Sequence, residues 1–143
     1  MSKYLGFGVM LSRLSGNSES VEAYTSAINK TIARAELTDS ALSLWFTDGT
    51  GIAFWDDGQS CCESRYFRTD DDLARLVGAV FLKAELRDAP GLPDEYGEHE
   101  IQFLDVQTSV GMVQVCAHNE HNGYYGGFSI RVKPLRAMEA PDA

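Results

Sequence analysis

Apolar and polar side chains alternate along residues 31–57, and this period of two restricts the fold more than any other feature of the chain. In the stretch ALSLWFTD, Leu42, Leu44 and Phe46 fall on one side of an extended chain, and the residues between them fall on the other. Turn residues at 39–40 and 48–51 interrupt the alternation. The region therefore predicts three short antiparallel strands joined as a meander.

The remaining elements follow from similar patterns. The segment SESVEAYTSAI, residues 18–28, begins with Ser and Glu and then places apolar residues at helical spacing, which predicts a capped helix. A second short helix is expected over 70–78, and the prolines and glycines of 89–98 predict a loop. Further strands are expected over 62–69, 79–88, 99–108, 111–119 and 125–133.

Two of these elements also predict which side chains are buried. In the helix over 70–78, Leu73, Leu76 and Val77 should face inward. The strand over 79–88 alternates cleanly, so its charged residues Lys83, Glu85 and Arg87 should lie outside. The residues expected inside this strand are Val80, Leu82, Ala84 and Leu86.

Together the elements predict an α+β fold in a single domain over residues 1–143. We expect a mostly antiparallel, bent β-sheet or a small barrel-like sandwich of about seven to eight strands with two short helices. Residues 1–17 are interpreted as an N-terminal extension, and residues 135–143 as a frayed tail.

Composition restricts the classes of function. The chain has 21 Asp and Glu against 12 Lys and Arg, a formal net charge of -9, which disfavours binding to nucleic acid or anionic membranes and favours basic partners. The simpler interpretation is that this charge only keeps a small protein soluble. No apolar run approaches the roughly 20 residues that cross a bilayer, and the first residues do not form a convincing signal peptide, so we expect a cytoplasmic protein.

The cysteines and histidines could carry chemistry in two ways. Three cysteines, Cys61, Cys62 and Cys116, make a secreted disulfide framework improbable because the count is odd. One of them could be a thiolate nucleophile activated by a nearby imidazole. Alternatively, Cys116, His118 and His121 could bind zinc, although their spacing fits none of the strong paired patterns. The structural interpretation is that each buried cysteine is a small apolar filler.

The stretch NEHNGYYGGFSI, residues 119–130, combines a turn with two tyrosines. Asn122 begins the turn dipeptide Asn-Gly, and Tyr124 and Tyr125 would point to opposite faces of a strand. The structural interpretation is a hairpin with glycines at a bulge. The functional interpretation is a recognition surface made by the turn, one tyrosine and His121.

Acidic residues gather in the middle of the chain, mostly in turns and at a helix start. Carboxylates in such places ordinarily cap helices and face water, but paired carboxylates can also perform acid-base chemistry or hold Mg²⁺. If they converge in space, they form a negative patch that can imitate a phosphate backbone. The residues concerned are Asp56, Asp57, Glu63, Asp70, Asp71 and Asp72.

Four segments together resemble an uncharacterised domain family encoded largely by bacteriophages and mobile elements. They are DGTGIAFW (48–55), GQSCCES (58–64), DDLARLVGAVFLKAE (71–85) and NGYYGGFSI (122–130), so the resemblance spans roughly residues 29–134. Its most specific motifs are GQ-x-CCE and NGYY. The family transfers no activity and no active-site assignment. What the resemblance implies is a small phage accessory protein that acts on host machinery by stoichiometric binding.

Three hypotheses about function follow. The leading one is a non-enzymatic inhibitor of a host defence complex in the host-cell cytoplasm, such as a CRISPR effector, that uses an acidic, nucleic-acid-mimicking surface against a basic protein or nucleoprotein. The alternative is a small-ligand, nucleotide-like binder with a pocket near the CCE and NGYY segments, and the third is a thiol- or metal-dependent enzyme. A binding role is favoured over an enzymatic one, with no cofactor, no membrane, no direct nucleic-acid binding and a homodimer as an option. The expected binding residues are Asp56, Asp57, Cys61, Cys62, Glu63, Asp70, Asp71, Asp72, His121, Asn122, Tyr124 and Tyr125.

Overall fold

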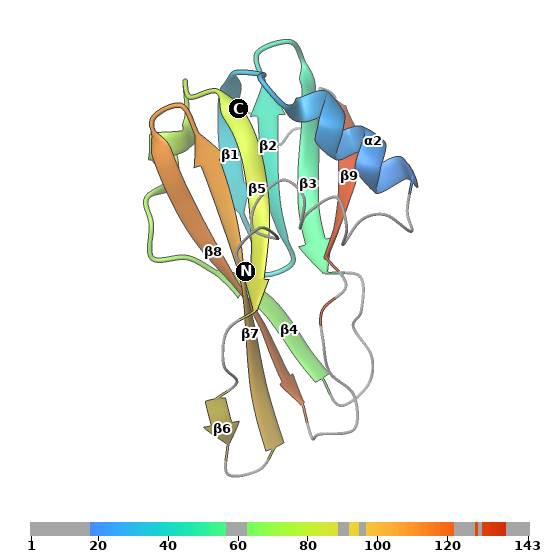
Figure 1. Ribbon diagram of the computed structural model, residues 1–143, viewed down its shortest axis with the longest axis vertical. Coiled ribbons are helices and arrows are strands. Elements are labelled where there is room, and N and C mark those ends of the chain that lie inside the picture. The colour runs from blue at the N-terminus through green and yellow to red at the C-terminus, as the bar shows by residue number, and fades with distance from the viewer. Residues whose placement is uncertain are drawn as a thin grey trace, which may run out of the picture.

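The computed structural model describes residues 18–56, 63–88, 92–94, 97–121, 128 and 130–136. Its strands form two antiparallel sheets that pack face to face, so the expected sandwich-like α+β fold is confirmed and the sheets do not close into a barrel (Figure 1). The elements in chain order are α2 (Ser18–Ala27), β1 (Ile32–Leu37), β2 (Ala41–Phe46), β3 (Thr50–Asp56), β4 (Glu63–Arg68), the 3-10 helix η2 (Leu73–Leu76), β5 (Phe81–Asp88), β6 (Leu92–Asp94), β7 (Gly97–Thr108), β8 (Gly111–His121) and β9 (Ile130–Arg136).

The first sheet has the strand order β1-β2-β3-β9 and confirms the predicted meander. Its β2–β3 turn is fixed by Asp48, whose carboxylate accepts hydrogen bonds from the Thr50 hydroxyl (2.6 Å) and backbone N–H (2.9 Å). These bonds from Thr50, with the ion pair from Lys30, lower the pKa of Asp48 to about 2. Leu42, Leu44 and Phe46 are all buried, as their alternation predicts.

The second sheet has the order β4-β8-β7-β5, and the short β6 pairs with β7. Figure 1 shows the β7–β8 hairpin extending beyond the first sheet, with β4 and β6 beside its far end. The loop predicted over 89–98 is wrong for Leu92–Asp94, which form β6 against the start of β7. Pro93 is compatible with this strand because, among the described strands, β6 pairs on one side only and a proline at a sheet edge can turn its missing N–H away.

The apolar core lies between the two sheets. Phe81 is fully buried there, and the ring centroids of Tyr24, Phe46 and Phe54 lie 6.0, 6.3 and 6.4 Å from its own. Tyr24 meets Phe81 edge to face, a favourable geometry for aromatic pairs. The rings come from the helix and both sheets, so they fix the helix and the sheets relative to one another.

Strand β5 departs from its predicted alternation at its first residues. A bulge between Phe81 and Lys83 shifts the register against β7, and an extra residue in one strand moves the following side chains to the opposite face. Phe81 is therefore fully buried, while Leu82 is 41% exposed. The burial prediction was wrong for Leu82, is met only partly by Val80, which is half-buried, and is confirmed for Ala84 and Leu86.

Three further details differ from the prediction. The 3-10 helix η2 ends at Leu76, so Val77 is extended and 54% exposed instead of facing inward. Glu85, expected outside, is buried and accepts a hydrogen bond from the amide of Gln107 (2.7 Å). Residues 135 and 136, predicted as the start of a frayed tail, belong instead to β9, which pairs with β3 as far as Arg136.

Helix α2 closes the sandwich between an edge strand of each sheet. Its Tyr24 hydroxyl accepts a hydrogen bond from the Ala84 N–H (3.0 Å) and donates one to the Ala84 carbonyl (3.3 Å), while its Ser20 hydroxyl accepts one from the Val132 N–H (3.1 Å). Figure 1 shows the helix over β3 and β9. These contacts satisfy backbone groups on β5 and β9 that would otherwise lie at open sheet edges. Among the described residues, no helix has the length and apolar character needed to span a membrane.

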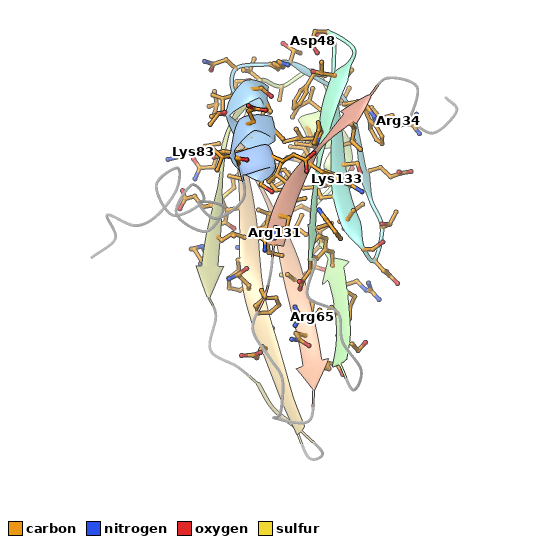
Figure 2. The ribbon with its side chains drawn as sticks, turned by 90° about the vertical axis from the view of Figure 1, so that its right-hand side faces the viewer. Arg34, Asp48, Arg65, Lys83, Arg131 and Lys133 are labelled. Atoms are coloured by element: carbon orange, nitrogen blue, oxygen red, sulfur yellow. The ribbon has the colours of Figure 1, made fainter. Side chains whose placement is uncertain are left out.

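The outward face of the first sheet carries two cations stacked on tryptophan rings although the chain has a net charge of -9. Arg34 lies over the ring of Trp45 (5.5 Å to the centroid), and Lys133 lies over the ring of Trp55 (5.2 Å). Figure 2 shows Lys133 and Arg131 along β9. Acidic character is therefore not spread evenly over the molecule.

Gly51 allows Trp45 to lie against the neighbouring strand, and we expect its replacement by Ala to destabilise the fold. A Cβ at this position would lie 2.8 Å from the Leu44 carbonyl oxygen and 2.9 Å from Cδ1 of Trp45. Because one of these neighbours is backbone, the strands must shift, which costs about 1–3 kcal/mol of unfolding free energy. Urea unfolding of Gly51→Ala measures this cost, and Ser43→Ala on the same face is the control. Equal stability of the two variants would contradict the close approach.

Candidate functional site

A cleft lies beside strand β4 where the two sheets meet. The β1–β2 turn, the end of β3 and the middle of β4 enclose a cavity of about 210 Å³. Three of its lining residues are aromatic, two are carboxylates and one is an arginine, a combination that suits a planar group with polar edges. We call it the β4 cleft, and its lining residues are Asp39, Ser40, Trp55, Asp56, Arg65, Tyr66 and Phe67.

An ion pair between Asp56 and Arg65 forms part of the lining. Nη1 of Arg65 lies 2.8 and 2.9 Å from the two carboxylate oxygens of Asp56, and the two side chains are only 7% and 6% exposed. A carboxylate and a guanidinium that are this well buried neutralise each other. Asp56 is thus an internal partner of Arg65, not a member of an exposed acidic surface.

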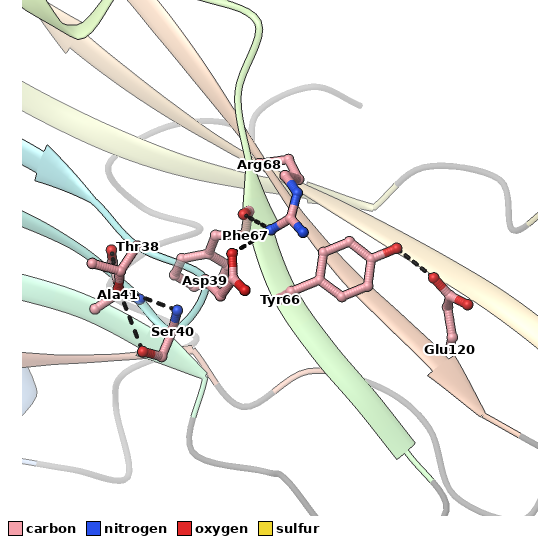
Figure 3. Close-up of polar contacts among 8 residues, drawn as sticks. All are labelled: Thr38, Asp39, Ser40, Ala41, Tyr66, Phe67, Arg68 and Glu120. Carbon is pink, nitrogen blue, oxygen red and sulfur yellow. Dashed lines mark hydrogen bonds and ion pairs between the residues drawn. The ribbon is translucent and has the colours of Figure 1, made fainter.

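The β1–β2 turn is held against the edge of β4. The Thr38 hydroxyl accepts hydrogen bonds from the N–H groups of Ser40 (3.3 Å) and Ala41 (3.2 Å), which shapes the turn. The Asp39 carbonyl then accepts one from the Phe67 N–H (2.9 Å), so the turn covers this part of the β4 edge. As a result, the Asp39 carboxylate stands at the rim of the cleft, where it is 78% exposed (Figure 3).

Tyr66 presents its ring at this rim in a fixed orientation. Its hydroxyl donates a hydrogen bond to the Glu120 carboxylate, and its ring stacks on His118 with centroids 4.7 Å apart and planes 9° apart. Burial and the Glu120 carboxylate raise the pKa of Tyr66 to about 12, so the hydroxyl is protonated near neutral pH. The guanidinium of Arg68 lies over the ring at 4.7 Å and pairs with Asp39 at 2.6 Å (Figure 3).

Asp70, Asp71 and Asp72 follow β4 directly and form what we call the acidic turn. Thr69 and Asp71 anchor it to β8: the Thr69 hydroxyl donates to the Gln114 carbonyl (2.7 Å), and Asp71 accepts from the Gln114 N–H (2.8 Å). Asp72 caps η2 through the Ala74 N–H (3.0 Å), as expected of a residue before a helix. Asp70 and Asp72 are exposed, so two of the three carboxylates face solvent beside the cleft strand.

Cys116 lies opposite Arg68 on β8 and is a poor candidate for a nucleophile. Burial, followed by the charges of Asp70, Asp105 and Asp71, raises the pKa of its thiol, which disfavours the reactive thiolate. His118, two residues further on, is engaged in the stack with Tyr66. Within the described ranges, no group of three or more His, Cys, Asp or Glu side chains is placed to hold a metal ion.

The predicted binding residues divide into those that the structure places and those outside it. Asp56 lines the cleft, and Asp70, Asp71 and Asp72 lie in the acidic turn. Glu63 and His121 are opposite each other in the β4–β8 ladder. The predicted residues outside the described ranges are Asp57, Cys61, Cys62, Asn122, Tyr124 and Tyr125.

Sequence reasoning missed most of the residues that shape the cleft. Asp39 lies in a turn, where a carboxylate ordinarily hydrogen-bonds to nearby backbone groups, so its position gave no sign of a binding role. Tyr66 and Arg68 did carry a signal, since residues two positions apart in a strand point to the same face. That pattern could not reveal the partner turn, because the contact between Asp39 and β4 joins residues that are distant in sequence.

One protein family matches most of the chain. A family model described as a domain of unknown function, DUF7448, matches residues 25–130, which is more than half of the chain. The chain belongs to this family. The expectation of an uncharacterised family is thereby confirmed, and the DUF7448 match includes all strands from β1 to β8. Neither a curated protein nor a solved structure matches the chain.

Proposed function

We propose that this DUF7448 domain is a non-enzymatic binding protein, carried by a phage or mobile element, that inhibits a host defence complex by occupying a basic surface of it. The observation that supports this most is the arrangement around β4. Aromatic walls and exposed carboxylates lie side by side there, at the β4 cleft and the acidic turn. Aromatic residues anchor protein interfaces, and complementary charge guides a basic partner toward them.

The charges support a protein partner more than a nucleic acid. The net charge of -9 repels phosphates and attracts Lys and Arg clusters over distances of about 8 Å at physiological salt. Among the described residues, Asp39, Asp70 and Asp72 are exposed carboxylates of this surface. A CRISPR effector is a suitable class of target because its nucleic-acid channel is positively charged.

Kinetic binding measurements with a purified CRISPR effector test this proposal. We expect binding that weakens as salt is raised, because rim charges act mainly on the association rate. The double variant Asp70→Asn and Asp72→Asn should lower the association rate by about tenfold, since it removes two exposed charges, and Asn keeps the η2 cap. Glu19→Gln with Glu22→Gln on α2 is the matched control, because it removes the same charge from another face.

Two outcomes would count against the proposal. Binding that is equally strong at high salt, or equally reduced by the acidic-turn variant and the α2 control, contradicts recognition through this surface. Failure to bind any effector, together with unchanged phage plaque counts on hosts that carry the matching defence systems, contradicts the inhibitor role itself. Both experiments use the full chain.

A small-ligand binder is the second candidate, and one observation favours it. The β4 cleft is bounded by three aromatic residues and lies on the strand that begins with the Glu of the CCE motif. At about 210 Å³, however, it is smaller than the roughly 300–1,000 Å³ of most ligand pockets, which favours a single side chain over a nucleotide. Native mass spectrometry of freshly purified protein distinguishes the two, because a retained small mass would support the ligand hypothesis.

A further inference from the structure

The exposed ion pair at the rim of the β4 cleft carries an inference about what the cleft binds. Nη1 of Arg68 lies 2.6 Å from the Asp39 carboxylate and donates to the Phe67 carbonyl (2.9 Å), while its guanidinium lies over the Tyr66 ring. Carboxylate and aromatic face together are the contacts that a guanidinium seeks in protein interfaces. The rim is therefore already shaped for an arginine, and the chain's own arginine occupies it.

This contact is weak enough to exchange. Arg68 and Asp39 are 56% and 78% exposed, and exposed pairs contribute about 0.2–1 kcal/mol because solvent screens them and their side chains lose freedom. The buried pair of Asp56 and Arg65 differs, because its side chains are 6–7% exposed. Of these two pairs in the cleft, the rim pair is the one that a partner can open without exposing buried charge.

The remaining rim groups stay in place if Arg68 moves. Tyr66 is held by Glu120 at its hydroxyl and by His118 at its ring, and Asp39 is held through its own carbonyl bond to the Phe67 N–H. None of these contacts uses the Arg68 guanidinium. The ring, and the turn backbone that carries the carboxylate, would thus remain positioned for an incoming side chain.

We propose that Arg68 is a displaceable internal substitute for an arginine side chain of the partner, which takes its place between Asp39 and Tyr66. The role of Arg68 rests on the proposed function in one respect, namely that the partner is a basic protein. It adds the chemical class of the anchoring residue, and it makes Arg68 an internal competitor that lowers affinity for that residue.

Titration with a model peptide tests the competition directly. The probe is an acetylated, amidated peptide with three arginines separated by glycines. Its binding is measured from the ¹H–¹⁵N NMR shifts of the full chain. Arg68→Ala, and independently Arg68→Gln, should tighten binding by about two- to fivefold, which is the range expected for releasing an exposed ion pair. Asp39→Asn should weaken binding at least as strongly, and in the double variant with Arg68→Ala the gain should be lost.

The control must separate competition from general charge. Lys83→Ala on β5 removes the same single positive charge, but Lys83 pairs with Glu85 (3.8 Å) and takes no part in the cleft. Tighter binding in Arg68→Ala but not in Lys83→Ala supports the proposal. Equal gains in both variants, or no gain in either Arg68 variant, overturn it.

The same experiment separates failure of this inference from failure of the proposed function. If the CRISPR effector binds at the acidic turn while the Arg68 variants bind the peptide no better than the unmodified chain, the internal competitor is wrong and the binding function stands. If neither effector nor peptide binds, both proposals fail. A matched peptide with lysines should bind more weakly, because lysine lacks the planar group that stacks on Tyr66.

Discussion

Replacing Asp56 by Ala is expected to lower the free energy of unfolding by about 3–5 kcal/mol, the largest effect of any single substitution considered for this chain. The reason is that Arg65 is only 7% exposed and loses the two short contacts to this carboxylate, at 2.8 and 2.9 Å. Since small domains are stable by about 5–15 kcal/mol, the variant should unfold at much lower urea concentration. Asp56→Asn, which keeps the shape of the side chain, should be destabilised less than Asp56→Ala.

A double variant and an exposed pair provide the controls. Replacing Asp56 by Leu and Arg65 by Met removes both charges, so it should cost less than the sum of the single changes. Asp39→Ala breaks the exposed pair with Arg68 and should cost below about 1 kcal/mol. If Asp56→Ala and Asp39→Ala lower the free energy of unfolding equally, the buried pair of Asp56 and Arg65 does not stabilise the contact between β3 and β4.

Replacing Tyr24 by Phe is expected to cost about 1–3 kcal/mol although the ring stays in the core. The Tyr24 hydroxyl accepts from the Ala84 N–H and donates to the Ala84 carbonyl, and Tyr24 is fully buried. Its loss leaves two backbone groups of β5 without these bonds and loosens the helix from the sheet edge. Urea unfolding near neutral pH measures the cost, and faster hydrogen exchange at Ala84 should accompany it.

The same hydroxyl predicts how stability depends on alkaline pH. Burial, opposed by the bond to Ala84 and aided by the charge of Glu85, raises the pKa of Tyr24 from 10.0 to about 12. Below pH 10 the group is protonated in both states, and its contribution is fully present. Between pH 10 and 12 only the unfolded chain releases the proton, so stability falls, by up to about 2.7 kcal/mol at 1.36 kcal/mol per pH unit.

The comparison with Tyr24→Phe isolates this effect from the other tyrosines. The stability difference between the unmodified chain and the variant should be constant below pH 10 and should shrink as pH rises toward 12. Tyr66→Phe should show a smaller change in the same direction, because the pKa of Tyr66 is also raised but Tyr66 is only half-buried. A difference that stays constant across pH 10–12 would contradict the buried hydroxyl of Tyr24.

Much of the fold could be predicted from local sequence patterns. Alternation located β1, β2 and β3, and the capped segment beginning at Ser18 became α2, because one buried face per element is a local property of the chain. The bulge before Lys83 could not be predicted in this way. It depends on how β5 pairs with β7, and a single extra residue reverses the phase of an otherwise clean alternation.

The candidate site was less predictable because it depends on contacts between distant segments. Asp56 was expected on an acidic surface, but its partner Arg65 comes from the other sheet and makes the pair internal. Conversely, Asp72 acts as a cap, as its position before a helix indicates. Charge and sequence order thus identified the acidic turn, whereas the cleft formed by Asp39 and Tyr66 required the three-dimensional structure.

Hydrogen–deuterium exchange of the full chain with and without a bound CRISPR effector tests the central claim most directly, because it maps the surface that the partner covers. We expect slower exchange over residues 38–40 and 64–72, which cover the β1–β2 turn, β4 and the acidic turn, with β2 and β9 unchanged. Protection on β2 and β9, where Trp45 and Lys133 lie, with no change over 64–72, would contradict binding through the β4 cleft.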